Sequence, residues 1–187
     1  MVMNILYVIL GIIAVVVLYV IGVFNGLIRL RNREREAESD IDVQTKRRYD
    51  LIPNLVETVK GYMKQEQGVL ESVTKARTQA MQTNGTALEK ASTENALSST
   101  LKTLFAVSEQ YPDLKSNTNF LELQRELSDT ENKIQAARRF YNSVVQDLNT
   151  KIESFPSNVI ANMFGFTKEN FFEVTSQAEK EPVQVKF

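Results

Sequence analysis

The sequence has 187 residues, a length that fits one membrane segment followed by one domain. Its 22 lysines and arginines nearly balance its 23 aspartates and glutamates, so the whole chain has no field that would attract nucleic acid. The absence of cysteine, histidine and tryptophan excludes disulfides, thiolate nucleophiles, Cys/His zinc sites and a Ser-His-Asp relay. We therefore expect neither a cofactor nor a metal.

The chain begins with an apolar segment. Residues from Ile5 to Phe24 carry no charge, and as a helix they span about 30 Å, the thickness of the hydrocarbon core of a bilayer. The segment lacks the basic start and small-residue exit of a cleaved signal peptide, so residues 1–28 are predicted to be a permanent anchor. A cluster of basic residues follows it: Arg29, Arg31, Arg33 and Arg35. By the positive-inside rule, these arginines predict a single-pass protein of the plasma membrane or bacterial inner membrane, with its N-terminus outside and its bulk in the cytoplasm.

Two features near the inner end of this segment are candidate contact sites. Gly22 and Gly26 form a G-x-x-x-G pair, which would allow a second membrane helix to approach closely. The four arginines lie at the level of anionic headgroups and are candidate lipid contacts, although a topology signal alone would also explain them.

Three long amphipathic helices are predicted after the anchor. The first covers about residues 27–81 and ends at an Asn84-Gly85 turn, which tolerates positive φ. The second covers about residues 87–110 and ends before Pro112. The third starts after Asn117 or Asn119 and carries apolar residues at alternating spacings of three and four, the pattern of a coiled-coil seam.

The lengths of these helices predict their arrangement. In an up-down-up order the middle helix returns only as far as Pro53, which leaves residues 29–50 as a stalk that would associate with other protomers. The fold prediction is all-α: a transmembrane helix that continues into an antiparallel bundle of three long helices, followed by a short C-terminal helix capped by Ser157. The predicted parts are an anchor at 1–28, a stalk at 29–50, a bundle at 51–172 and a mobile tail at 173–187.

Five of the ten phenylalanines lie near the C-terminus: Phe155, Phe164, Phe166, Phe171 and Phe172. They could dock on a membrane or a partner, but covering the end of the third helix explains them sufficiently. The up-down-up order places them far from the membrane.

Several short patterns resemble catalytic or modification motifs. Ser72 and Lys75 fit S-x-x-K, but the companion motifs of that enzyme class are missing. The Asn84-Gly85-Thr86 sequon is explained by the turn, and the glycines form no phosphate-binding loop. The sequence therefore predicts a protein that is not an enzyme.

The run DIDVQTKRRYDLIPNLVETVKGY, residues 40–62, places a proline inside an amphipathic helix. Pro53 cannot donate to the carbonyl of Tyr49, so we expect either a kink or a new helix capped by Asp50. The charges of Lys46, Arg47 and Arg48 point in directions about 100° apart, which suits contacts on several sides better than one active site.

Two long motifs give the chain a resemblance to a known family. The run LRNREREAESDIDVQTKRRYDLIPNLVETVKGY, the run ELQRELSDTENKIQAARRFYNSVVQDLNTKIESFP and the closing NMFGF closely resemble the LemA family of bacterial membrane proteins. The positions that match the hallmarks of the family are Asp42, Lys46, Arg47, Arg48, Asp50, Leu51, Pro53, Asn54, Gln124, Leu127, Thr130, Glu131, Asn132, Ala137, Arg138, Tyr141, Asn142, Phe155 and Pro156. The resemblance implies a cytoplasm-facing helical bundle on one membrane span, without an established enzymatic activity. It also implies a scaffold role, in some relatives beside membrane proteases or in the formation of internal membranes.

The leading hypothesis is a non-enzymatic, oligomeric membrane scaffold or adaptor that presents its bundle to partner proteins, a membrane protease or another membrane protein among them. An alternative is a membrane-shaping protein that acts on the inner leaflet through its arginines. The candidate assembly or partner surface consists of Gly22, Gly26, Asp42, Lys46, Arg47, Arg48, Asp50, Pro53, Asn54, Glu131, Asn132, Arg138 and Asn142.

Overall fold

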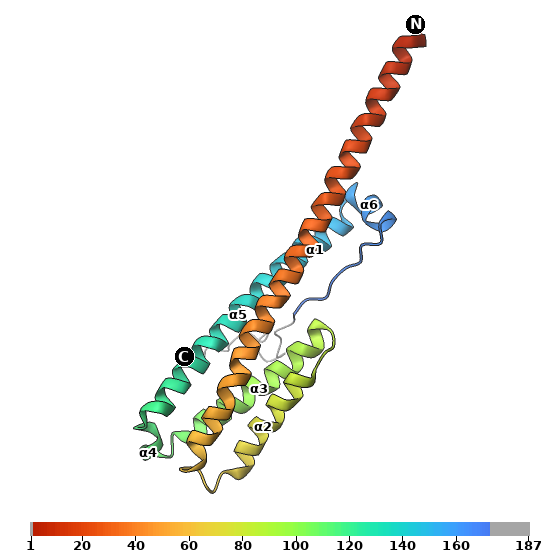
Figure 1. Ribbon diagram of the computed structural model, residues 1–187. Coiled ribbons are helices and arrows are strands. Elements are labelled where there is room, and N and C mark those ends of the chain that lie inside the picture. Colours follow the sequence, from red (N-terminus) through yellow and green to blue (C-terminus); the bar gives the residue numbers. More distant parts are fainter. Residues whose placement is uncertain (1, 173–187) are drawn as a thin grey trace, which may run out of the picture. The chain divides into compact units, whose positions relative to one another are not determined.

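The computed structural model describes residues 2–172 of the chain, and all regular structure in this range is helical. The all-α prediction is therefore confirmed for these residues, whereas the predicted mobile tail lies outside them. Six helices follow one another along the chain (Figure 1): α1 (Val2–Lys60), α2 (Gln67–Gln82), α3 (Ala87–Ser108), α4 (Pro112–Lys115), α5 (Thr118–Glu153) and α6 (Ser157–Met163).

The described residues form two compact units, and α1 and α5 contribute to both. The first unit contains residues 2–39 and 140–169. The second unit contains residues 40–139 and 170–172.

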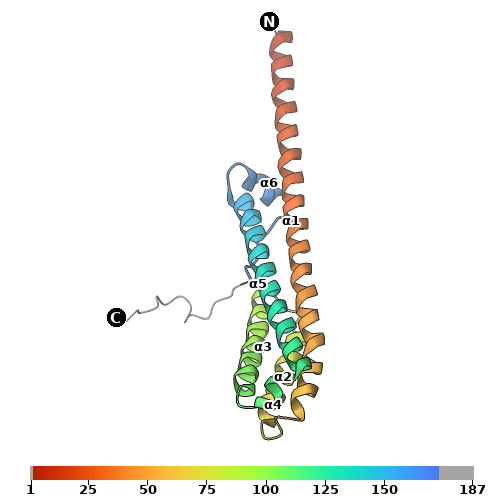
Figure 2. The same ribbon diagram turned by 90° about the vertical axis from the view of Figure 1, so that its left-hand side faces the viewer.

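The second unit is built from five helical segments: the end of α1, then α2, α3, the short α4 and the beginning of α5. Figures 1 and 2 show α2 and α3 side by side as an antiparallel hairpin. Apolar residues at helical spacing meet in a shared core, which includes Leu55 and Val59 of α1, Val73 of α2, Leu104 of α3 and Phe120 of α5. The first part of the inward face predicted for the third helix, with Phe120 and Leu127, is thus buried in this unit, whereas Tyr141, Val144 and Leu148 belong to the first unit.

The predicted continuous helix over residues 27–81 is wrong, because α1 ends at Lys60 and α2 begins at Gln67. The amides of Tyr62 and Met63 both bond to the carbonyl of Val59, which closes the last turn of α1 before the chain reverses. Because of this extra reversal, the described residues form four long helices (α1, α2, α3 and α5), whereas the sequence predicted three.

The predicted stalk is also wrong, and of the two outcomes expected at Pro53, a kink or a restart, the restart is excluded. Ala37, Ile41 and Arg48 are buried within the single chain, so residues 29–50 do not lack partners. Pro53 lies inside an uninterrupted helix, and Asp50 therefore caps nothing.

The turn between α2 and α3 exists as predicted, but for a different reason. Gly85 does not have a positive φ; Thr86 caps α3 in a reciprocal capping box with Glu89. A Cβ at Gly85 would lie 1.8 Å from the Glu89 carboxylate, so any larger residue would displace this flexible side chain from its position in the capping box.

The short C-terminal helix is present, and Gly165 follows it with a φ of 69°, the conformation that glycine adopts most readily after a helix. Ser157, however, does not cap it. Its hydroxyl donates to the carbonyls of Lys151 and Ser154 at 2.7 and 2.8 Å.

The first unit packs α6 and the end of α5 against α1. Its core consists of Val23, Leu27, Leu148, Ile152, Ile160, Ala161 and Phe166. The ring centroid of Phe24, at the end of the apolar segment, lies 4.8 Å from that of Phe164 and 6.0 Å from that of Phe166. The prediction that the C-terminal phenylalanines lie far from the membrane segment is therefore wrong for Phe164 and Phe166, because the extra reversal brings this part of the chain back to α1. Phe171 and Phe172 belong to the second unit.

The apolar part of α1 extends beyond this core. Side chains from Met3 to Tyr19 are exposed. Among the described residues, α1 is the one helix long and apolar enough to cross a membrane.

Candidate functional site

A buried polar cluster in the second unit gathers several of the residues that the sequence singled out. Arg48 is fully buried, and its Nη1 donates to Ser98 Oγ at 2.7 Å and to Glu131 Oε2 at 2.5 Å. Its Nη2 pairs with the carboxylate of Glu94. One cation of α1 is thus held by two carboxylates, one from α3 and one from α5.

The two carboxylates are themselves tied into the cluster. Tyr49 donates its hydroxyl hydrogen bond to Glu94, and Ser98 donates to Glu131 at 3.1 Å. Burial lowers the pKa of Arg48, and the negative charge of Glu131 opposes that effect. Burial raises the pKa of Tyr49, so its hydroxyl keeps its proton at neutral pH. The charges are compensated inside the bundle, which favours a structural role over a catalytic one.

Arg138 lies at the edge of this cluster with fewer partners. Its Nη1 donates to Asn95 at 2.9 Å, and its guanidinium lies 5.0 Å from the ring centroid of Phe172. Its Nε and Nη2 are buried without a hydrogen-bond partner among the described residues. Burial and the charge of Arg48 lower the pKa of Arg138 to about 10, so it remains a cation at neutral pH.

The remaining polar candidates of α1 lie at the surface. Asp42 is 3.7 Å from Lys90, and Arg47 is 3.8 Å from Glu126, both in exposed or half-exposed pairs. Four residues are exposed: Lys46, Asp50, Pro53 and Asn54. The structure therefore brings together Arg48 with two candidates of α5, Glu131 and Arg138, and leaves the other α1 candidates apart.

Two candidates of α5 lie outside the cluster. Asn132 lies on an exposed face of the second unit, in a shallow depression with Gln124 and Asp129. Asn142 belongs to the first unit, where it is half-buried.

Sequence reasoning missed the residues of α3 that complete the cluster. Glu94 lies three residues after Ala91 and three before Leu97, on the apolar stripe of that helix. A carboxylate on a buried stripe needs a cation, and this spacing could have indicated one. Ser98 and Asn95 carry no comparable signal, because their role depends on which helix faces α3.

The proline of α1 has a partner on α2 that the sequence did not indicate. The carbonyl of Tyr49 has no donor from Pro53, since proline carries no N–H. Arg77 Nε of α2 donates to this carbonyl at 2.8 Å. A side chain of the neighbouring helix therefore replaces the missing backbone bond, and α1 continues to Lys60.

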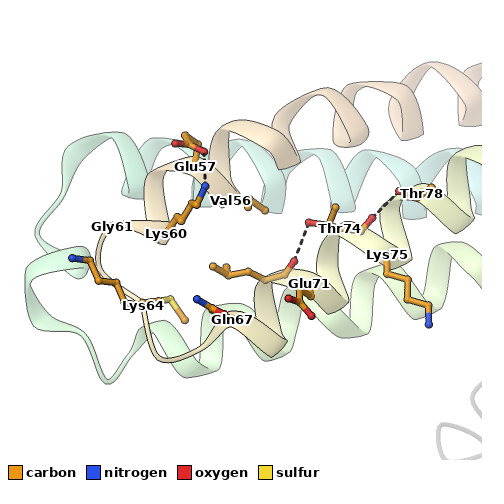
Figure 3. Close-up of a pocket in the computed structure, with 12 residues that line it drawn as sticks. Val56, Glu57, Lys60, Gly61, Lys64, Gln67, Glu71, Thr74, Lys75 and Thr78 are labelled. Carbon is orange, nitrogen blue, oxygen red and sulfur yellow. Dashed lines mark hydrogen bonds and ion pairs between the residues drawn. The ribbon is translucent and has the colours of Figure 1, made fainter.

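An open groove of about 930 Å³ lies between the end of α1 and α2 (Figure 3). Its apolar lining includes Val56, Met63 and Leu70. Charged side chains surround it: Glu57, Lys60, Lys64, Glu71 and Lys75. Lys60 pairs with Glu57 at 4.0 Å, and no ion pair is found for Lys64 or Lys75 among the described residues.

The candidate lipid and helix contacts belong to the first unit. Arg29, Arg33 and Arg35 are exposed, although the guanidinium of Arg33 lies 5.4 Å from the ring centroid of Phe140. The guanidinium of Arg31 lies 5.1 Å from the ring centroid of Phe166.

The two glycines of the G-x-x-x-G pair leave space on α1. A Cβ at Gly22 or Gly26 would meet no heavy atom within 4 Å.

Over residues 2–172, the fold and the sites define a helical protein with one apolar helix of membrane-spanning length and a buried arginine paired with two carboxylates. The chain belongs to the LemA family, whose model matches residues 37–187. It is 29% identical to the protein LemA of Metamycoplasma hominis, over 83% of this chain and 71% of that protein. It is also 24% identical to the magnetosome proteins MamQ 1 and MamQ 2 of Paramagnetospirillum magneticum, over 71% of this chain. The match spans only 58% of the length of these two relatives.

Proposed function

We propose that this protein is a non-enzymatic scaffold or adaptor, anchored in the plasma or inner membrane by its first 28 residues, whose cytoplasmic, coiled-coil-like bundle binds partner proteins. The groove between α1 and α2 is the observation that carries this proposal. The cluster around Arg48 supports the non-enzymatic part of the proposal, because the carboxylates of Glu94 and Glu131 are engaged in hydrogen bonds within the bundle.

The occupant that fits the groove is an amphipathic helix of a partner protein with acidic residues beside its apolar face. Val56 is half-buried in the groove beside the buried core residues Met63 and Leu70, and apolar grooves bind the apolar face of a helix. Lys64 and Lys75 supply positive charge for carboxylates of the partner. A membrane protein of the same bilayer is a partner that the anchor would keep nearby.

The test places a photo-crosslinking amino acid at Thr78, a groove residue, in the full chain in cells, and identifies the crosslinked peptides by mass spectrometry. We expect an acidic amphipathic segment, whose crosslinking falls at least several-fold in a Lys64→Glu, Lys75→Glu variant. The matched control is Lys102→Glu, an exposed charge reversal on α3, which should leave crosslinking unchanged. Equal crosslinking in both variants, or crosslinks to this chain alone, would contradict the proposal.

Self-association through the membrane helix is a separate part of the proposal. Gly22 and Gly26 have free space beside them, as a close helix-helix contact requires. In detergent, light scattering should show an oligomer for the native chain and a smaller mass for Gly22→Leu, Gly26→Leu. A native chain that is already monomeric would remove oligomerisation from the function.

The proposed orientation can be tested because the native chain contains no cysteine. A single cysteine at Ser92, exposed on α3, should react with a membrane-impermeant maleimide only after the cells are opened. Labelling in intact cells would place the bundle outside the cytoplasm.

A second candidate function is the shaping of the inner leaflet, supported by the exposed side chains of Arg29, Arg33 and Arg35 directly after the apolar segment. Purified protein would then tubulate or cluster vesicles that contain phosphatidylglycerol, and Arg→Gln at these positions and at Arg31 would abolish the effect. Vesicles that keep their shape at every anionic lipid content would exclude this function.

A further inference from the structure

The surface of α6 and of the turn before it has large apolar side chains that are exposed in the described part of the chain. The four that form this α6 patch, with the exposed fraction of each, are Phe155 (83%), Val159 (57%), Met163 (69%) and Phe164 (49%). Single exposed apolar residues are common on proteins, but a group on one short segment indicates a binding surface.

The opposite side of α6 fixes this patch beside the membrane segment. Ile160 and Ala161 are buried in the core that also contains Val23 and Leu27 of α1. Val20 packs against the same core, and it lies one helical turn, about 6 Å, inside the apolar segment that ends at Phe24.

Aromatic contacts tie the patch itself to the same level of α1. The ring of Phe164 is 4.8 Å from that of Phe24, measured between centroids. The depth of the Phe164 ring in the bilayer therefore differs from that of the Phe24 ring by no more than this 4.8 Å, whatever the tilt of the helix.

Charged groups lie just beyond this level. The guanidinium of Arg31, two turns after Phe24, lies 5.1 Å from the ring centroid of Phe166. Lys168 and Glu153 form an exposed ion pair at 2.9 Å in the same unit. Apolar side chains thus lie at the end of the membrane segment, and cationic side chains follow directly after it. This order matches the layers of a single leaflet, in which the acyl chains are followed by the headgroups.

We propose that the α6 patch inserts into the leaflet from which α1 emerges and forms a second, interfacial membrane contact beside the transmembrane helix. Its partner is lipid, at the boundary between acyl chains and headgroups. This inference rests on the anchoring of α1 proposed above. The α6 patch would then bind lipid in addition to α1, although one transmembrane helix is sufficient to anchor the chain.

The native chain contains no tryptophan, so one introduced tryptophan reports on one position. The full chain is reconstituted in vesicles of phosphatidylcholine and phosphatidylglycerol, with bromine either near the headgroup or at the ends of the acyl chains. Met163→Trp and Val159→Trp report on the patch, and Val15→Trp reports on the middle of the membrane segment. Leu88→Trp, an exposed apolar position on α3, is the matched control in the second unit.

We expect bromine near the headgroup to reduce the emission of both patch variants more than bromine at the chain ends, since an interfacial face lies roughly 5–10 Å deep. Val15→Trp should show the opposite order, and Leu88→Trp should show no loss. The inference is overturned if Val15→Trp is quenched while both patch variants behave like Leu88→Trp. A blue shift of the patch variants without quenching also overturns it, because protein then covers the patch. An unquenched Val15→Trp instead refutes the anchoring proposal, on which this inference depends.

Discussion

Each of the two units contains a buried ionisable side chain, Arg48 in the second unit and Glu34 in the first, and the charges around these two side chains differ. In the second unit the cation of Arg48 contacts two carboxylates, Glu94 and Glu131. In the first unit the buried carboxyl of Glu34 has Glu38 and Glu169 nearby, and these raise its pKa in addition to the effect of burial.

The difference shows how burial acts on stability. A buried charge with paired and hydrogen-bonded neighbours fixes the arrangement of the helices around it, and removal of one partner leaves the others uncompensated. The carboxyl of Glu34 is compensated less, because burial and the neighbouring acids raise its pKa more than the Tyr141 hydrogen bond and the charge of Arg35 lower it. The second unit should therefore depend on its buried charge, whereas the first unit should tolerate the loss of its own.

The largest effect is expected from Arg48→Met. Glu94 would remain buried and Glu131 half-buried without their cation, and breaking such a pair typically costs about 3–5 kcal/mol. Chemical unfolding of the full chain in detergent, followed by circular dichroism, measures this loss. Arg47→Met is the control, because its contact with Glu126 is exposed and should contribute less than about 1 kcal/mol. Equal losses in the two variants would show that the buried pairs of Arg48 contribute no more to stability than an exposed pair.

The next effect concerns the carbonyl of Tyr49, an uncharged acceptor in the second unit. Arg77→Met removes its donor and should cost about 1–3 kcal/mol. In Pro53→Ala the backbone N–H of the new alanine can bond to the same carbonyl, so Arg77→Met should cost less in that background. A double-mutant cycle of unfolding free energies measures the coupling. Additive effects of the two substitutions would show that Arg77 does not replace the bond that Pro53 lacks.

Pro53→Ala alone tests a separate expectation about the helix. We predict that the variant straightens α1 and alters assembly while its helix content remains nearly unchanged. Far-ultraviolet circular dichroism and light scattering in detergent measure the two quantities. Unchanged oligomer mass and partner binding would make Pro53 a local feature of α1 without a role in assembly.

Glu34→Gln in the first unit should raise the unfolding free energy at pH 7, whereas the substitution of Arg48 should lower it. Because the folded state raises the pKa of Glu34 above its usual 4.5, its contribution to stability is complete below that pH and is lost as the pH rises through the folded pKa. Glutamine removes this loss, so the variant should gain about 0.5–2 kcal/mol at pH 7, as stabilising substitutions commonly do. The gain should vanish near pH 4. A variant less stable than the native chain at pH 7 would show that the carboxylate is compensated after all.

The smallest effect is expected where charge is not buried. Lys168 and Glu153 of the first unit are exposed, and Lys168→Met should change the unfolding free energy by less than about 1 kcal/mol. The small loss should decrease further in high salt, which screens exposed pairs. A loss of unfolding free energy comparable with that of Arg48→Met would show that burial is not the cause of the large effect expected at Arg48.

The sequence predicted much of the fold because some boundaries have strong local causes. Pro112 ends one helical pattern, and Gly165 marks the end of α6. The end of α1 was missed because Gly61 is a weak signal by itself, and the apolar stripe continues with suitable spacing into α2. Glu66 interrupts the stripe directly before α2, but a single polar residue on an apolar stripe is also compatible with one continuous helix.

The cluster around Arg48 was only partly predictable, for a different reason. The motif residues identified Arg48, Glu131 and Arg138, but the direction of each side chain depends on the number of helices. With one reversal too few, Glu94 could not be placed opposite Arg48. Contacts between distant helices thus require a correct topology, whereas helix ends require only local chemistry.

The bond from Arg77 to the carbonyl of Tyr49 has an evolutionary consequence. A proline within α1 is tolerated in this chain because a donor on α2 satisfies the carbonyl that it leaves free. Positions 53 and 77 should therefore covary among family members that have this hairpin. Lineages that have lost the arginine should also have replaced the proline with a residue that carries its own amide hydrogen.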